Sequence, residues 1–464
     1  MGRLFWGGTE EVTMRKTKVR KTAALFPVAV VGLGKLGLSM AVAYAKRGCR
    51  VMGVDIQADW VGRINRGECP IEEAEVPDLL KKYRNRLTAT TNMEDALRDA
   101  RIVFIIVATP SGADGSFSNA QVVEAVRAVG QALRGVSRYV VVAITCTVMP
   151  GTTEDTVKPL LEETSGKRCG EGFGLVYNPE FIALGSVVRD LLNPDFVLIG
   201  ECDRRAGNVM AQFYHRVTEN RAPLARVRPR EAEIAKIALN CYCTTKIAFA
   251  NMLAEIAERV PGVDALAIAD ALGLDSRIGR KYLSPGLGFG GPCFPRDNVA
   301  FRAFARSLGM AAPIPEAVHS SNMRQVERVV EAAKALLPAG GRVAILGLSY
   351  KAGTPVVEES QPLEIAKRLA AEQGWAVSVY DPMAMERART VLGDRVQWAS
   401  SLDQCIEGAD LCVLAMAWKE FQHIKAARLK RLMKVPRVLD CWRCLDQSAA
   451  AQVEYHAIGL GPRT

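Results

Sequence analysis

A glycine-rich turn between two apolar segments is the feature that most constrains the fold of this chain. Residues 28–31 read VAVV, and Gly32, Gly34 and Gly37 follow in a G-x-G-x-x-G pattern. A helical apolar pattern comes next, and a second strand-like segment, RVMGVD, closes on Asp55. A strand, turn, helix and strand in this order, with an acidic residue about twenty positions beyond the glycines, are typical of a Rossmann domain that binds a dinucleotide.

The same segment indicates which dinucleotide is bound. The glycines allow a pyrophosphate to approach the helix N-terminus. Asp55 is placed to bind the adenosine ribose diol, and no arginine follows it directly, so we expect NAD rather than NADP. A nucleotide-free α/β domain with chance glycines is the alternative. The expected cofactor contacts in this segment are Gly32, Leu33, Gly34, Lys35, Leu36, Gly37 and Asp55.

Later strand-like segments end in polar residues. RIVFIIVATP ends at Thr109 and Pro110. YVVVAITCTVMPGT contains Thr147, and GLVYNPEF contains Glu180. Loops at the carboxyl ends of parallel strands hold the ligands of such sheets, so Thr109, Pro110 and Thr147 join the expected cofactor contacts. Taken singly, a threonine or glutamate there is better explained as a helix cap.

The segment EAEIAKIALNCYCTTKIAFANMLAEIAERV has an uninterrupted helical pattern. Lys236 and Asn240 are four positions apart, so they share a face. Within an apolar helix such a pair is either a solvated edge or a site that binds an oxyanion. The helix is long and apolar enough that we expect it to pack against another chain as well as its own domains.

One cysteine occurs in the glycine- and proline-rich segment KYLSPGLGFGGPCFPRD, with Asp297 four positions beyond Cys293. Pro295 and the apolar spacing after it predict a helix that ends at Gly309. Cys293 would then precede a helix N-terminus, where the dipole and free N–H groups favour a thiolate. The glycines would let the backbone approach a ligand. A small buried residue without chemistry is the alternative role for this cysteine.

Length and charge narrow the class of protein. A chain of 464 residues predicts two or three domains. The net charge of +10 favours anionic ligands, and the scattered basic residues favour small molecules over nucleic acid. One basic cluster, Met14–Thr22, lies in an N-terminal tail. The cysteines lack zinc-ligand spacing, and no signal peptide or membrane-spanning run is visible, so we expect no metal, no membrane contact and a cytoplasmic location.

The C-terminal part begins a further α/β unit. GRVAILGLSYKAGT predicts a strand and turn, QPLEIAKRLAAEQG a helix, and AVSVYDP, DLCVLAMAW and PRVLDCW further strands. Its glycine pattern is degenerate. We therefore expect a nucleotide-like ligand in this unit rather than a second NAD.

Together these segments resemble the UDP-glucose/GDP-mannose dehydrogenase family from about residue 28 to the C-terminus. The resemblance rests on VVGLGKLG, TCTVMPGT, YNPEF, AKIALN, DSRIGRKYL, GLGFGGPCFPRD and LGLSYKAGT, all in the family's order. It implies an α/β protein with an N-terminal Rossmann NAD domain, a central long-helix dimerisation domain and a C-terminal Rossmann-like nucleotide-sugar domain. The expected boundaries are a tail over 1–27 and domains over 28–222, 223–325 and 326–464.

The resemblance also implies a reaction: the four-electron oxidation of a nucleotide-sugar primary alcohol to a uronic acid, with two NAD reduced and UDP-glucose as the favoured substrate. Cys293 would attack the intermediate aldehyde, and the thiohemiacetal would be oxidised to a thioester that water hydrolyses. Lys236 and Asn240 match residues that stabilise oxyanion-like intermediates, and Asp297 matches an acid that orders water or takes a proton. Glu180 and Thr147 match residues used around hydrolysis and the first oxidation.

Substrate contacts follow from the same resemblance. The glycine loop before Cys293 would wrap the nucleotide sugar, and Arg277 would reach into the site of a neighbouring subunit, so we expect a homodimer or a multiple of it. The expected substrate-binding residues are Glu180, Phe181, Lys236, Asn240, Arg277, Tyr282, Gly288, Phe289, Gly290, Tyr350, Lys351 and Arg443.

Three positions depart from the family pattern. Leu184 stands where a second glutamate is common, and Glu358 where an arginine is common, and both places lie near the nicotinamide end of NAD in the family. Trp60 stands where a basic residue often covers the adenosine, and its indole could stack there instead. These departures bear on cofactor geometry and hydrolysis.

Several alternatives remain open from the sequence. The substrate could be a UDP-N-acetylhexosamine or GDP-mannose. A simple two-electron dehydrogenase shares the Rossmann start and the Lys–Asn helix but needs neither the cysteine loop nor a third domain. A catalytically weak protein that binds nucleotide sugars is the alternative from another class, and only Leu184 and Glu358 support it.

Overall fold

The computed structural model describes residues 26–462. The N-terminal tail and the basic cluster predicted from the sequence lie outside the described residues, except for positions 26 and 27. Phe26 is buried, and the guanidinium carbon of Arg101 lies 4.1 Å from its ring centroid. Among the described residues, Phe26 is therefore the first that joins the N-terminal core.

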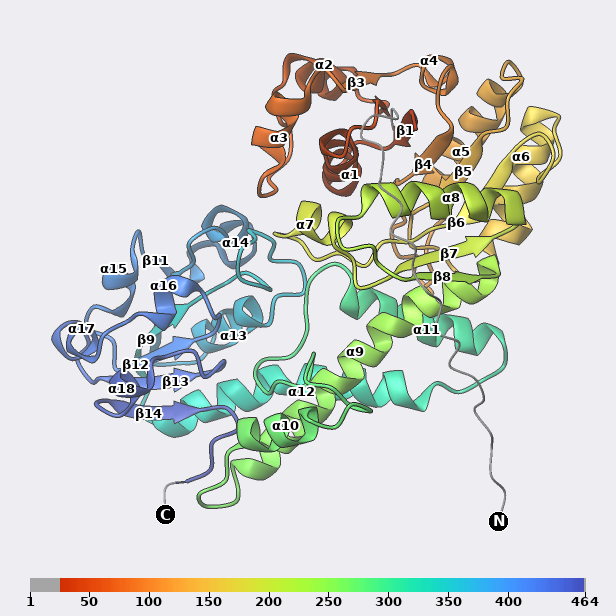
Figure 1. Cartoon of the computed structure of the whole chain (residues 1–464). Coiled ribbons are helices and arrows are strands. Elements are labelled where there is room, and N and C mark those ends of the chain that lie inside the picture. The colour runs from red at the N-terminus through yellow and green to blue at the C-terminus, as the bar shows by residue number, and fades with distance from the viewer. Residues whose placement is uncertain (1–25, 463–464) are drawn as a thin grey trace, which may run out of the picture.

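An eight-stranded sheet with the order β3-β2-β1-β4-β5-β6-β7-β8 forms the N-terminal half of the structure (Figure 1). Its strands pair in parallel except for β6 and β7, which are antiparallel. The chain order changes direction between β1 and its neighbours β2 and β4, and in such sheets the ligand lies at the carboxyl ends of the strands beside this point. The strands are β1 Val28–Val31, β2 Val51–Val54, β3 Leu87–Thr90, β4 Ile102–Ile105, β5 Val141–Ile144, β6 Gly174–Tyr177, β7 Val197–Glu201 and β8 Leu224–Val227.

Helices cover both faces of this sheet, and one buried cluster lies on each face. The four residues of β1 alternate between the two clusters, with Val28 and Val30 in one and Ala29 and Val31 in the other, as expected for a central strand that is buried on both sides. The helices of this part are α1 Lys35–Lys46, α2 Ala58–Arg66, α3 Val76–Tyr83, α4 Met93–Leu97, α5 Ala120–Leu133, the π-helical turn η1 Thr152–Val157, α6 Lys158–Ser165, α7 Val187–Leu192 and α8 Arg204–Val217.

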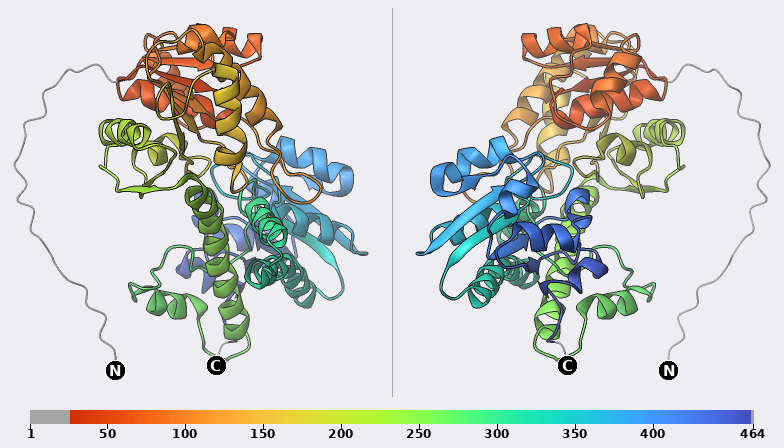
Figure 2. Two further views of the ribbon diagram at one scale, coloured as in Figure 1. Left: turned by 90° about the vertical axis from the view of Figure 1, so that its right-hand side faces the viewer. Right: turned by 90° about the vertical axis from the view of Figure 1, so that its left-hand side faces the viewer.

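Helix α9, Pro229–Ala257, is the 29-residue helix that the sequence predicts, and it runs from the first sheet toward the C-terminal part (Figure 2). Pro229 begins it, and the Glu231 carboxylate accepts a hydrogen bond from the Arg228 backbone N–H at 2.9 Å. This capping box fixes the helix start. The other central helices are α10 Ala265–Gly273, α11 Phe294–Ser307 and α12 Pro313–Leu336.

The C-terminal part is a six-stranded parallel sheet with the order β11-β10-β9-β12-β13-β14. Its strands are β9 Gly341–Leu346, β10 Trp375–Tyr380, β11 Gln397–Trp398, β12 Leu411–Leu414, β13 Arg437–Asp440 and β14 Glu454–Ala457. Its helices are α13 Gln361–Ala370, α14 Met385–Leu392, the 3-10 turn η2 Gly393–Arg395, α15 Leu402–Ile406, α16 Lys419–Gln422, α17 Ala426–Leu432 and α18 Gln447–Ala450. The predicted fold class, two Rossmann-like α/β parts joined by a long-helix segment, is confirmed. Among residues 26–462, none of the helices has the length and hydropathy needed to span a bilayer.

Candidate active site

In the glycine turn after β1, protein atoms crowd the Cβ positions of two glycines, Gly32 and Gly37, whereas the space at Gly34 is open. A Cβ at Gly32, where φ is +92°, would lie 2.3 Å from the Ile106 carbonyl oxygen. A Cβ at Gly37 would lie 1.8 Å from the Gly32 carbonyl oxygen. At Gly34 no heavy atom outside its chain neighbours and helix backbone lies within 4 Å of the Cβ position. The turn therefore leaves room for a pyrophosphate at Gly34, where α1 begins.

Two side chains brace this turn through Leu33. The Leu33 N–H donates to Asp55 Oδ2 at 2.9 Å, and the Trp60 indole N–H donates to the Leu33 carbonyl at 2.9 Å. Asp55 is half-buried, so the carboxylate also has a solvent-facing side that fits a ribose diol. The half-buried Trp60 ring packs against the N-terminal core, so the indole supports the turn from its protein side. These residues fit NAD.

A buried carboxylate that the sequence did not reveal contacts the same turn. Glu73, whose side chain is 1% exposed, lies 3.6 Å from Lys35 Nζ and accepts a hydrogen bond from the Gly185 N–H at 2.8 Å. Lys351 Nζ lies 3.3 Å from the Leu184 carbonyl oxygen. The peptide after Leu184 is therefore held from the N-terminal part by Glu73 and from the C-terminal part by Lys351.

Helix α9 presents Lys236 and Asn240 to the site on one buried face, as their spacing predicts. Lys236 Nζ donates to the Glu180 carbonyl oxygen and lies 4.7 Å from the centroid of the Phe181 ring. Asn240 Nδ2 donates to Asp297 Oδ2 at 2.6 Å. The pair therefore joins α9 to the segment after β6 and to the first turn of α11.

Asp297 is 1% exposed, and burial raises the pKa of its carboxyl group against the opposing effects of Lys236, Arg296 and Asn240. Its second oxygen, Oδ1, lies 3.5 Å from Arg296 Nε and has no hydrogen-bond partner among the described residues. One oxygen is thus held by the Asn240 hydrogen bond, while the other has only the ion pair with Arg296. A buried carboxyl group with a raised pKa is suited to general acid–base chemistry.

Cys293 occupies the N-cap position of α11, as the sequence predicts, and its side chain is exposed. Protein nevertheless surrounds the thiol closely enough that loss of hydration raises its pKa to about 11, with Lys236 opposing this rise and Asp297 and Glu180 adding to it. The expected thiolate at a helix start is therefore not what this environment favours. The thiol is neutral at pH 7 and must give up its proton when it attacks.

Side-chain amides from three helices hold the backbone of the loop before Cys293. Asn251 on α9 accepts from the Gly286 N–H at 2.9 Å, and Asn322 on α12 accepts from the Phe289 N–H at 2.8 Å. Gln361 on α13 accepts from the Gly288 N–H at 2.6 Å. The thiol is thus mounted on a loop whose backbone conformation is fixed by the protein.

The glycines of this loop have a packing role that the sequence analysis did not anticipate. A Cβ at Gly288 would lie 2.0 Å from Asn322 Oδ1, and one at Gly290 would lie 2.1 Å from the Glu359 carbonyl oxygen. A Cβ at Gly291, where φ is +78°, would lie 2.4 Å from the Tyr350 ring. These glycines are needed for close packing against the C-terminal part, apart from any contact with a ligand.

Thr109 and Thr147 are brought together. Thr109 Oγ1 donates to the Thr147 carbonyl at 2.8 Å, and Arg296 Nη1 lies 3.3 Å from the Thr109 carbonyl oxygen. Thr147 is half-buried and Pro110 is exposed. The loops after β4 and β5 therefore meet the helix that follows Cys293.

The C-terminal part contributes Tyr350 and the backbone of Glu358. The half-buried Tyr350 ring packs over Gly291, and the Gly291 N–H donates to the Glu358 carbonyl at 3.0 Å. Burial and the nearby Cys293, Glu73 and Glu358 raise the pKa of Tyr350 to about 12, so its hydroxyl stays protonated. The Glu358 side chain is exposed, and its backbone carbonyl makes the contact with the cysteine loop.

Three residues predicted to contact the substrate either pair with another side chain of the protein or are exposed to solvent: Arg443, Arg277 and Tyr282. The two terminal guanidinium nitrogens of Arg443 donate to the Asp264 carboxylate, at 2.9 and 3.0 Å. The Arg277 side chain is 86% exposed and paired with Asp275. Tyr282 is 48% exposed, with its ring 5.9 Å from that of Phe294.

The C-terminal sheet has its own acidic residue at the end of β10, but protein groups occupy it. Asp381 is 1% exposed and accepts from the Leu348 N–H at 2.8 Å, the Ser349 N–H at 3.1 Å and the Trp418 indole N–H at 3.3 Å. Asp55, in contrast, is half-buried. In the C-terminal part, where the glycine pattern is degenerate, the carboxylate of Asp381 is thus already bound by protein N–H groups and is not available to a ribose.

Glu233 is a further buried carboxylate that the sequence analysis missed. It is 0% exposed and accepts hydrogen bonds from Gly151 N and from the N–H and hydroxyl of Thr153. Lys236, three positions later, and Asn240, seven positions later, lie along the same side of the helix. Helical spacing from Lys236 could have identified this residue.

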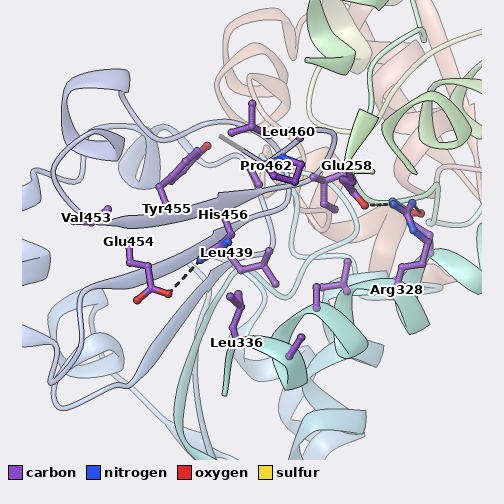
Figure 3. Close-up of a pocket in the computed structure, with 17 residues that line it drawn as sticks. Glu258, Arg328, Leu336, Leu439, Val453, Glu454, Tyr455, His456, Leu460 and Pro462 are labelled. Atoms are coloured by element: carbon purple, nitrogen blue, oxygen red, sulfur yellow. Dashed lines mark hydrogen bonds and ion pairs between the residues drawn. The ribbon is translucent and has the colours of Figure 1, made fainter. Parts of the chain in front are cut away.

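A cavity of about 640 Å³ between α12, β14 and the C-terminal end is lined by none of the predicted site residues (Figure 3). Its charged groups pair with one another: Arg328 with Glu258 at 2.6 Å, and His456 with Glu454 at 3.3 Å. No cluster of three or more His, Cys, Asp and Glu side chains able to hold a metal ion occurs within residues 26–462. The cysteine loop and its surroundings are therefore the site with unpaired reactive groups.

Comparisons with known proteins place these features in a family context. Three models of the UDP-glucose/GDP-mannose dehydrogenase family match the chain: the NAD binding domain over residues 26–218, the central domain over 230–324 and the UDP binding domain over 344–447. The UDP-glucose 6-dehydrogenase AglM of Haloferax volcanii is 35% identical over 398 residues, which are 85% of this chain and 92% of that protein. The GDP-mannose 6-dehydrogenase of Pseudomonas putida is 33% identical over 410 residues, which are 85% of this chain and 92% of that protein.

Solved structures give the same result. A UDP-glucose dehydrogenase from the archaeon Pyrobaculum islandicum superposes with a TM-score of 0.84 at 35% identity, covering 96% of this chain and 99% of that one. A UDP-D-ManNAc dehydrogenase from Pyrococcus horikoshii superposes with a TM-score of 0.79 at 25% identity, covering 93% of this chain and 99% of that one.

Proposed function

The chain belongs to the UDP-glucose/GDP-mannose dehydrogenase family and is an NAD-dependent nucleotide-sugar 6-dehydrogenase, and we propose that it oxidises UDP-glucose to UDP-glucuronate through a covalent intermediate on Cys293. The observation that carries this proposal is that an exposed thiol shares its surroundings with Lys236 and with the Asn240–Asp297 pair. A simple alcohol dehydrogenase has no use for a nucleophile at this point. The UDP binding domain matched over residues 344–447 supports a uridine nucleotide.

The first oxidation needs a base and a hydride acceptor. NAD, when bound at the glycine turn, supplies the hydride acceptor for both oxidations. Lys236 and Asn240 stabilise negative charge on the sugar oxygen as the hydroxyl proton passes to Asp297, which releases it to solvent before the second oxidation. The half-buried Thr147, held through its carbonyl by Thr109, lies in the same group of loops and positions this hydroxyl.

In the second stage, the Cys293 sulfur forms a bond to the aldehyde carbon and its proton leaves to Oδ1 of Asp297. Asp297 passes this proton on to the former carbonyl oxygen, which becomes the hydroxyl of a thiohemiacetal. Transfer of a hydride from that carbon to the second NAD, and of the hydroxyl proton to Asp297, leaves a thioester. Water then adds to the thioester, the C–S bond breaks, and the thiol and the sugar carboxylate are released. Glu180 and Asp297 orient this water.

The described surface supports assembly with a second copy of this chain. Exposed apolar residues follow one side of α9 and continue just past its end: Tyr242, Phe249, Met252, Ile256 and Val260. A groove of about 700 Å³ runs between α9 and α12 beside them, and Ile314 of α12 is 64% exposed at its edge. An apolar stripe of this kind is typical of an interface. A dimer would also give the exposed Arg277 a neighbouring site to enter.

A panel of nucleotide sugars tests the proposed function. NADH formation is followed with UDP-glucose, UDP-N-acetylhexosamines and GDP-mannose, and the sugar product is identified by mass spectrometry. We expect the highest kcat/KM with UDP-glucose and two NADH per UDP-glucuronate. One NADH per product would indicate a two-electron dehydrogenase. Binding of nucleotide sugars without any turnover would indicate a binding protein.

A further inference from the structure

Glu233 is a fully buried carboxylate that the proposed chemistry does not use. Its Oε2 accepts a hydrogen bond from the Gly151 N–H at 2.6 Å. Its Oε1 accepts from the Thr153 N–H at 2.8 Å and from the Thr153 hydroxyl at 2.6 Å. No cation among residues 26–462 forms an ion pair with it, although it is 0% exposed. Glu233 therefore caps the N-terminal end of the η1–α6 helix from a different helix, α9.

This cap belongs to a network that begins and ends on α9. Glu233 holds Gly151, and the chain leads back four residues to Thr147, whose carbonyl accepts from Thr109 Oγ1 at 2.8 Å. The Thr109 carbonyl lies 3.3 Å from Arg296 Nη1. Arg296 precedes Asp297, which returns to α9 through Asn240 at 2.6 Å. The loops after β4 and β5 are thereby fastened to the helix that carries Lys236 and to the helix that begins at Cys293.

We propose that Glu233 is a positioning residue for the oxidation: its carboxylate sets the distance between the Thr147 segment and the Lys236–Asn240 face. This inference rests on the proposed function and adds a residue to its machinery. A displacement of about 1 Å at a catalytic group costs on the order of 100-fold in rate, so a cap that holds one half of the site against the other has a large effect on kcat.

Both side-chain oxygens of Glu233 are needed as hydrogen-bond acceptors, beyond the volume of the side chain. Burial raises the pKa of its carboxyl group, and the hydrogen bonds from Thr153 and Gly151 oppose that rise. A glutamine has one acceptor oxygen, so its amide nitrogen would face either the Gly151 N–H or the Thr153 donors. The glutamine NH2 group would then face a backbone N–H, and that buried N–H would lose its acceptor. We expect the segment around Gly151 and Thr153 to shift as a result.

The first experiment compares E233Q with E231Q. Glu231 lies two positions away on the same helix, and its side chain is 49% exposed. Glutamine can replace glutamate in the capping box that Glu231 forms at the start of α9. E231Q therefore makes the same charge change as E233Q but leaves the contacts of Glu233 with Gly151 and Thr153 intact. We expect E233Q to lower kcat by about 10- to 100-fold while the KM values for NAD and the nucleotide sugar stay within about threefold, and E231Q to match the parent. A parent-like kcat in E233Q, with or without a lower Tm, would overturn the proposal.

Hydrogen exchange tests the role of Glu233 without measuring turnover, so its result does not depend on whether the proposed function is correct. Hydrogen exchange of the peptide over residues 145–157 should be faster in E233Q than in the parent and unchanged in E231Q, whatever the substrate proves to be. Equal exchange in E233Q and the parent would refute the positioning role even in an enzyme with another sugar specificity.

If E233Q does not fold, Thr153 gives a milder test. T153V removes the hydroxyl donor at 2.6 Å, and T153S keeps it. We expect T153V to lose about tenfold in kcat and T153S to recover most of it. Equal kcat in T153V and T153S would contradict the inference.

Discussion

Asn240 Nδ2 lies 2.6 Å from Asp297 Oδ2, and both side chains are buried. The amide thereby occupies one carboxylate oxygen, whereas the other, Oδ1, has no hydrogen-bond partner among the described residues and lies 3.5 Å from Arg296 Nε. A carboxylate held in this way can turn only one oxygen toward a proton donor. The orientation of the carboxylate that we propose as the proton acceptor for Cys293 is therefore set by α9.

Replacing Cys293 with serine should separate the two oxidations. The C293S variant keeps the glycine turn and the Lys236–Asn240 face, so NAD and nucleotide-sugar binding and the first oxidation should persist. The second oxidation should nearly stop, or a slowly hydrolysed ester should accumulate, because an alcohol is a much weaker nucleophile than a thiolate. The ratio of NADH to sugar acid and the mass of the enzyme measure this. Free sugar acid at the parent rate, with two NADH each, would mean that Cys293 is a packing residue.

Alkylation of Cys293 in the ligand-free enzyme should depend steeply on pH. Burial raises the pKa of the thiol to about 11, so the thiolate fraction grows about tenfold per pH unit between pH 7 and 9. We expect the rate of iodoacetamide labelling at Cys293, followed by peptide mass spectrometry, to rise in proportion. The partly buried Cys69 serves as an internal reference in the same digest. A rate that levels off near pH 7 would instead indicate the stabilised thiolate of an unshielded helix start.

The D55N variant should weaken the preference for NAD over NADP. The asparagine oxygen can still accept the bond that Leu33 N makes at 2.9 Å, and only the solvent-exposed bond from the Gln57 N–H, at 3.0 Å, is lost. The negative charge that opposes a 2′-phosphate and binds the ribose diol is lost. We expect the ratio of kcat/KM for NADP to that for NAD to rise by about tenfold or more, mainly through loss with NAD. Comparable use of NADP by the parent enzyme would show that Asp55 does not select the cofactor.

A methyl group at Gly291 should destabilise the cysteine loop. Its Cβ would lie 2.4 Å from the Tyr350 ring, and its φ of +78° is strained for alanine. G309A is the matched control, because φ is +73° and nothing lies within 4 Å of the Cβ position. We expect G309A to cost about 1 kcal/mol of unfolding free energy and G291A about 2–3 kcal/mol, from the added clash. Denaturant titration measures both, and equal losses would mean that the ring moves aside freely.

Disruption of the apolar stripe on α9 should release monomers. Met252 is 48% exposed within it, and a glutamate there would place a charge in the proposed interface. We expect the parent to be a dimer or a multiple of one by light scattering, M252E to dissociate, and V391E, at a residue 44% exposed on α14, to remain assembled. A fully active parent monomer at working concentration would refute the assembly.

Local pattern and spacing predicted much of this molecule. The 3.6-residue periodicity located α9 and placed Lys236 beside Asn240, and Pro295 located the start of α11, which begins at Phe294, to within one residue. These features depend on neighbours within one helical turn, so the sequence contains them directly.

The sequence could not supply what depends on distant segments. The indole of Trp60 finds its partner at Leu33 across 27 positions, and Gly288 finds Gln361 across 73. The raised pKa of Cys293 arises because protein excludes water around a thiol whose local position favours ionisation. Helix-terminal electrostatics were readable from the sequence, whereas desolvation needs the packed structure.

The amide contacts to the cysteine loop also bear on how the enzyme matures. Asn251 precedes the loop in the chain, but Asn322 follows Phe289 by 33 positions and Gln361 follows Gly288 by 73. During synthesis the thiol therefore emerges well before two of the groups that hold its loop, and it stays unorganised until α13 has been made and docked. Contacts of such separation form late. A chain cut short before residue 361 would therefore carry the nucleophile on a loop that lacks the Gln361 contact to Gly288.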